Sequence, residues 1–94
     1  MFFILQVRQT RSMNNEDKKH FITSDFYAAA FCLAKGLKLL SVDWNNPHRA
    51  SFVFRETENR EGLVEDFLYG RALIEPKSFV AGIKQLKELL HHND

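Results

Sequence analysis

The side chains best suited to chemistry in this sequence are four histidines and one cysteine. His91 and His92 are adjacent, and neighbouring residues of a helix point about 100° apart, so a regular helix cannot aim both at one metal ion. Neither has a cysteine or an acid at a ligand-like offset, and His20 and His48 stand alone. We therefore expect no metal site and no bound cofactor.

Cys32 and the carboxylates are the remaining candidates for catalysis. Cys32 falls inside a predicted helix, away from the helix N-terminus that lowers the pKa of a thiol, so a small buried or half-buried filler is the favoured interpretation. Asp25 and the acids from Glu56 to Asp66 could form a carboxylate pair, but their spacing is that of a solvated helix surface. We expect no catalytic residues and no enzymatic activity.

Two groups of residues could contact a nucleic acid. One is a basic flank of the C-terminal helix, and the other is a loop whose aromatic and basic side chains could stack on a base. These residues are Lys77, Lys84, Lys87 and His91 in the helix, and Trp44, His48 and Arg49 in and beside the loop. Because the formal net charge is only +1, the chain has no general field that attracts nucleic acid, and a solvated surface is favoured.

The N-terminal segment is the candidate for self-association. Its apolar residues are Phe2, Phe3, Ile4, Leu5 and Val7. The segment lacks a preceding basic region and is too short for an export signal or a membrane span. The single cysteine gives no reason to place the chain in an oxidising compartment, so a cytoplasmic location is the default. A short strand on a sheet edge or in a dimer contact is favoured, and a non-native translation start is the alternative. With the polar run that follows, it forms an N-terminal unit over residues 1–20.

One globular domain is expected over residues 21–92, and its best-defined part is a hairpin from Leu39 to Arg55. Val42 is set opposite Phe52, Leu40 opposite Phe54 and Trp44 opposite Ala50. This register makes one face wholly apolar. The other face then carries Ser41, Asp43, Ser51 and Arg55, together with Leu39 and Val53.

Three helices are predicted around the hairpin. The first is capped by Thr23, Ser24 or Asp25, buries Phe26, Ala29, Ala30, Leu33 and Leu37, and stops at Gly36. The second is capped by Thr57 or Asn59, buries Leu63, Val64, Phe67 and Leu68, and ends at Gly70. The third starts at Pro76 and buries Phe79, Ile83, Leu86 and Leu90.

These elements predict an α+β fold, in which a small antiparallel sheet packs against three helices because a lone hairpin is marginal in water. The order is helix, strand, strand, helix, helix, after a further strand near the N-terminus. Either 21–22 or 72–74 could widen the sheet.

Scattered core and turn residues resemble a family of small bacterial and phage-associated domains catalogued only as a domain of unknown function. The residues that carry this resemblance are Thr23-Ser24-Asp25, Lys35-Gly36-Leu37, Phe52-Val53-Phe54, Phe67 with Gly70-Arg71-Ala72, and Phe79 with Leu86-Lys87. The resemblance covers residues 21–90. It implies a bacterial or prophage origin and supplies no catalytic residues.

The leading expectation is therefore an interaction module that acts through protein–protein contacts and self-association. A nucleic-acid accessory protein is the alternative. No membrane partner and no small-molecule ligand are inferred.

Overall fold

The computed structural model describes residues 19–92 and confirms the α+β fold. The elements are β2 (His20–Thr23), α2 (Phe26–Ala34), β3 (Leu39–Asn46), β4 (Arg49–Arg55), α3 (Arg60–Leu68) and α4 (Pro76–His92). The strand expected from Met1 to Val7 and the polar run up to residue 18 lie outside the described residues.

The sheet has three antiparallel strands in the order β2-β4-β3, so β4 is central. The third strand comes from Phe21 and Ile22, one of the two expected sources, and it begins one residue before the expected domain boundary, at His20. The other source, residues 72–74, forms no strand and lies in the connection between α3 and α4.

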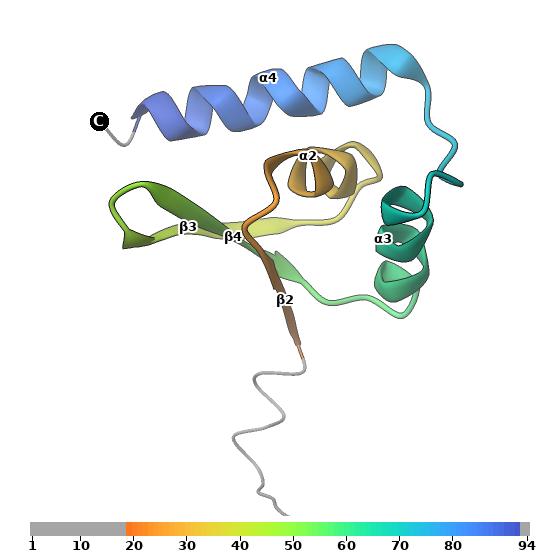
Figure 1. Ribbon diagram of the computed structural model, residues 1–94, viewed down its shortest axis with the longest axis horizontal. Helices are drawn as coiled ribbons and strands as arrows, with labels where there is room; N and C mark the ends of the chain where they lie inside the picture. The colour runs from red at the N-terminus through yellow and green to blue at the C-terminus, as the bar shows by residue number, and fades with distance from the viewer. Residues whose placement is uncertain (1–18, 93–94) are drawn as a thin grey trace, which may run out of the picture.

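Helix α2 lies between α4 and the sheet, whereas α3 stands at one end of the domain (Figure 1). This position buries α2 on several sides, and five consecutive residues are almost inaccessible. They are Ala28, Ala29, Ala30, Phe31 and Cys32. The periodicity predicted one buried stripe on this helix, and the structure buries more because α2 packs against two layers and α3.

The register of the hairpin agrees with the prediction at its centre and differs at its start. Val42 is opposite Phe52 and Asp43 is opposite Ser51, as expected. However, Leu39 rather than Leu40 is opposite Phe54, because a bulge lies between Leu39 and Ser41. Leu39 therefore packs against the core, and the expectation that Leu40 faces Phe54 is wrong.

A second irregularity changes the far end of the hairpin. Between Asp43 and Asn46 the register shifts again, and Asn46 pairs with Arg49 across the turn at Pro47 and His48. The predicted pairing of Trp44 with Ala50 is thus lost, and Trp44 is 43% exposed.

The caps of α2 follow local chemistry. Asp25 is the N-cap among the three candidates, and its carboxylate accepts hydrogen bonds from the backbone N–H groups of Tyr27 (3.0 Å) and Ala28 (3.1 Å). Thr23 Oγ1 accepts a bond from the N–H of Asp25. Past the helix, Gly36 has φ 97°, the left-handed conformation that glycine adopts most easily.

Aromatic packing joins the three helices. The ring of Phe31 in α2 stacks on Phe67 in α3 with centroids 5.0 Å apart, and Phe67 lies 6.3 Å from Phe79 in α4. Helix α3 buries Val64 as predicted, but Leu68 is exposed, so its assignment to the core is wrong. It falls on the side of α3 away from this aromatic contact, where no described element covers it.

Helices α2 and α4 approach so closely that Gly82 has no room for a side chain. A Cβ at Gly82 would lie 2.6 Å from the carbonyl oxygen of Ala30. Gly82 has no distinguishing signal in the sequence, whereas its neighbours Ile83 and Leu86 lie on the buried face as predicted. Small residues at both positions bring α4 down onto α2.

Replacing Gly82 with alanine should lower the free energy of unfolding by about 1–3 kcal/mol, because the added methyl group meets fixed backbone. Gly62→Ala is the matched control, since Gly62 is also helical and a Cβ there meets nothing within 4 Å. This control should be stabilising by about 0.5–1 kcal/mol. Equal effects of both variants in urea titrations would contradict the close approach.

Phe52→Ala should cost about 3–5 kcal/mol, because Phe52 is fully buried in the core on the face of β4 that packs under the helices. Ser51→Ala, one residue earlier on the opposite face, should cost far less. Denaturant titrations of both variants test the assignment of faces, and similar losses would mean that it is wrong.

Candidate functional site

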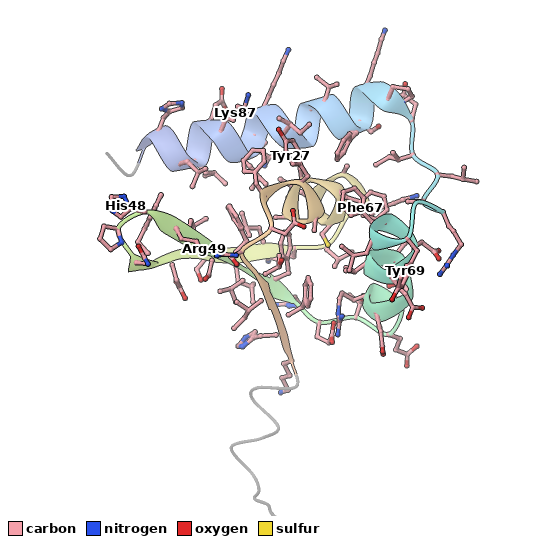
Figure 2. All side chains as sticks on the ribbon, viewed as in Figure 1. Tyr27, His48, Arg49, Phe67, Tyr69 and Lys87 are labelled. Carbon is pink, nitrogen blue, oxygen red and sulfur yellow. The ribbon has the colours of Figure 1, made fainter. Side chains whose placement is uncertain are left out.

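The residues expected to contact nucleic acid lie in two separate parts of the fold, the β3–β4 hairpin and α4. Figure 2 shows His48 at the hairpin turn and Lys87 on α4. The side chains of Trp44, His48 and Arg49 are exposed on the hairpin. Those of Lys77, Lys84, Lys87 and His91 are exposed on the faces of α4 that do not pack on α2.

The histidines of the described residues are spread over different elements. His20 is in β2, His48 is in the hairpin turn and His91 is near the end of α4. Among residues 19–92, no three His, Cys, Asp or Glu side chains are grouped as a metal ion requires. The same part of the chain contains no helix with the length and hydrophobicity needed to cross a bilayer.

Cys32 is buried and held in its neutral form. Burial raises the pKa of its thiol from the ordinary value of 9.0 to about 11, and this effect outweighs the opposing charge of Arg60. Because the thiolate is the reactive form, this environment suppresses nucleophilic chemistry. The structure thus places Cys32 in the core, between the sheet and the helices.

An ion pair fastens the start of α3 to the sheet. Arg60 donates to both carboxylate oxygens of Glu56, at 2.8 and 2.7 Å, and its guanidinium lies 4.3 Å from the centroid of the Phe21 ring in β2. The hydrogen bond from Arg60 lowers the pKa of Glu56 and in return raises the pKa of Arg60. These contacts of Arg60 are to Glu56 and Phe21 of the same domain, so this charged pair has a structural role.

The backbone of β3 offers a different kind of site. In the central strand, the N–H of Arg55 donates to the carbonyl of Lys38 before β3, whereas the N–H of Glu56 donates to the carbonyl of Lys19 before β2. The backbone N–H and C=O groups of successive residues in a strand point to opposite sides. Those of Phe52 therefore point toward β2, and those of the opposite residue, Val42, point outward from the edge of the sheet. Within residues 19–92, no strand lies beyond β3 to accept those bonds.

A groove runs along this outer edge of β3, between the strand and the C-terminal half of α4. Five consecutive residues of the strand and its approach, Lys38 to Val42, line one side. Leu33 of α2, Leu37 in the loop after it, and Gln85 and Leu89 of α4 complete the lining. We call this surface, with the outer edge of β3, the edge groove.

Large apolar side chains border the edge groove without being covered. Leu40, displaced by the bulge, is 38% exposed, and Leu89 is 37% exposed. Unpaired backbone groups beside such side chains are the features that accept an added strand. The sequence did not reveal this site. The site exists because β3 is an edge strand, and β3 is an edge strand only because β2 pairs with the opposite side of β4.

A second apolar area lies at the connection of α3 and α4. It contains Leu68, Tyr69 and Leu73, all more than half exposed. Lys35 Nζ donates to the carbonyl of Leu73 at 2.7 Å, and Arg71 lies over the Tyr69 ring. This area has no free strand edge, so the edge groove is the better-defined site.

The buried thiol makes stability fall at alkaline pH. Between about pH 9 and pH 11 the unfolded chain releases the thiol proton while the folded chain keeps it, so the free energy of unfolding declines as pH rises. Cys32→Ala lacks this proton, and its stability should decline less steeply over the same range. Urea titrations of both proteins at several pH values measure the difference, and parallel curves would exclude a buried thiol.

Comparison with known proteins gives one match. Neither a curated protein nor a solved structure matches the chain. The family described as "Domain of unknown function (DUF5659)" matches residues 18–92, from the approach to β2 to the end of α4. The match contains every described strand and helix, and the chain therefore belongs to the DUF5659 family.

Proposed function

We propose that this chain is a non-enzymatic interaction module that binds an extended apolar segment of a protein at the edge groove. We propose a bacterial or prophage origin, as the resemblance seen in the sequence implies, and a cytoplasmic location, which is the default for a chain with a single cysteine. The single observation that supports the proposal is that the edge of β3, on which no other strand of residues 19–92 pairs, lies beside the apolar side chains of Leu33, Leu37 and Leu89.

Strand addition at this edge would use two kinds of contact. The outward backbone groups of Val42 can pair with the backbone of any extended segment, which contributes affinity without regard to sequence. Alternate side chains of that segment would point between β3 and α4, toward Leu37 and Leu89, and would favour apolar residues. The preferred ligand is therefore a short strand with one apolar face.

Binding of nucleic acid is the second candidate function. Its support is that the ion pairs formed within residues 19–92 use Arg60 and Arg71, so the exposed lysines of α4 are not paired there. Against it, Val80 interrupts the basic flank, and the hairpin loop belongs to another element. Retention on heparin that falls steeply with salt would favour this function.

The peptide-binding function can be tested without knowing the natural partner. Phage-displayed peptides selected on the immobilised full chain should alternate large apolar and polar residues. Leu89→Lys should weaken the selected peptides roughly tenfold or more, because it places a charge at the side of the edge groove. Fluorescence anisotropy of labelled peptides measures this loss.

Val80→Lys is the matched control. It adds the same charge to the same helix at a residue that is 48% exposed and lies outside the edge groove. Peptide affinity should stay unchanged in this variant. Selected peptides that bind Leu89→Lys as well as the original chain would show that the edge groove is not the binding surface.

A further inference from the structure

We infer that the segment bound at the edge groove is acidic at its C-terminal end, and that this carboxylate binds a basic pocket at one end of the sheet. The basic pocket is the hollow lined by Lys19, His20, Leu40, Arg55 and Glu56. The inference rests on the proposed function, because the bound segment is the same. It adds the charge of that segment and the direction in which it lies on β3.

The first support is that all three strands bring basic residues to this end of the sheet. Lys19 and Lys38 directly precede β2 and β3, His20 begins β2, and Arg55 ends β4. His20 is opposite Arg55 in the sheet, and the backbone N–H of Arg55 donates to the carbonyl of Lys38 at 2.9 Å. Residues far apart in the sequence thus form one basic end.

The second support is that the acid in the basic pocket is already paired. Arg60 donates to both carboxylate oxygens of Glu56, at 2.8 and 2.7 Å. Within residues 19–92, no ion pair involves Lys19, Lys38 or Arg55, and all three side chains are exposed. Their positive charges are therefore available to a carboxylate from outside, to which arginine can donate two hydrogen bonds.

The third support is that the basic pocket and the edge groove meet. Leu40 lines both hollows, and Lys38 lines the edge groove close to it. A strand added to β3 lies two strand spacings, or about 10 Å, from β4. A glutamate on the added strand and the long side chain of Arg55 span this distance from opposite sides.

The two contacts fall on opposite faces of the added strand. Phe54 is buried in the core under the helices, so the next residue, Arg55, lies on the other face of the sheet. Side chains of the added strand alternate in the same way. One short segment can therefore place apolar side chains in the edge groove and a carboxylate over the basic pocket.

The direction of the segment follows from the position of the basic pocket. Lys38 precedes β3, so this pocket lies at the N-terminal end of β3. An added strand that is antiparallel to β3, as are all the described strand pairs, has its C-terminal end there. Farther along β3, Asp43 is exposed and would repel a carboxylate placed opposite it. An acid at the N-terminal end of the segment is therefore disfavoured.

Phage display on the full chain tests the charge of the segment. The selected peptides should carry an acid near the C-terminal end of their alternating stretch. Synthetic copies with acetylated and amidated ends carry no terminal charge, so only this side chain is compared. Replacing the acid with its amide should weaken binding roughly threefold or more in fluorescence anisotropy. The loss should shrink between about 0.1 M and about 1 M salt, because the Debye length falls from about 10 Å to about 3 Å.

Moving the acid tests the direction. A peptide with its acid at the N-terminal end should bind no better than the amide form. Tighter binding of this peptide than of the original would overturn the inference.

Arg55→Gln and Arg49→Gln form a matched pair of variants. Both remove one positive charge from an exposed residue of β4, at opposite ends of the strand. Arg55→Gln should weaken the acidic peptide roughly threefold or more and leave the amide form unchanged, and Lys38→Gln should act likewise. Arg49→Gln should change neither peptide. Urea titrations check that the variants remain folded, and equal effects of the two arginine variants would contradict the basic pocket.

Leu89→Lys separates failure of this inference from failure of the proposed function. The variant is compared with the original chain at about 1 M salt, where the added charge attracts the peptide little. If Leu89→Lys weakens peptides that bind equally well as acid and amide, the edge groove binds peptides and the basic pocket does not contribute. If the acid matters but Leu89→Lys has no effect, the carboxylate is bound without the edge groove, and the proposed function and this inference both fail.

Discussion

The close approach of α2 and α4 at Ala30 and Gly82 is the contact on which the rest of the structure depends. A side chain as small as a methyl group at Gly82 would meet the backbone of α2, so the two helices are held at a short fixed separation. That separation lets Leu86 reach the core and sets the height of α4 above β3. The width of the edge groove is therefore determined where the helices cross, several residues away from Leu89.

The elements of this fold could be predicted because each carries its own local signal. Asp25 caps α2, Gly36 and Gly70 have positive φ where the first two helices end, and Pro76 begins α4. The bulge at Leu40 could not be predicted. A regular strand without a bulge places Leu40 on the buried face, and that face is as apolar as the one that carries Leu39 in the structure. It became visible only once the pairing of Leu39 with Phe54 was known. Leu68 was misassigned for a similar reason, since the helical pattern does not say how far a neighbour extends over it.

The candidate site was less predictable than the fold. The residues considered for chemistry, such as Cys32, can be recognised in the sequence by their residue type. In the structure, burial raises the pKa of this thiol, which disfavours its reactive thiolate form. An open strand edge has no residue type of its own. It is defined by what lies beside it, and this depends on β2 pairing with one side of β4 and leaving β3 on the other.

The central position of β4 also shapes the order in which the sheet can assemble. Asn46 and Arg49 are three residues apart, so the hairpin closes with little loss of chain entropy, whereas Thr23 and Phe52 are 29 residues apart. The longer closure costs about 1–2 kcal/mol more in chain entropy and brings α2 with it. The hairpin can thus form first and serve as a template for β2. Until β2 arrives, β4 is itself an edge strand, and this brief stage is when the folding chain is most exposed to pairing with another copy.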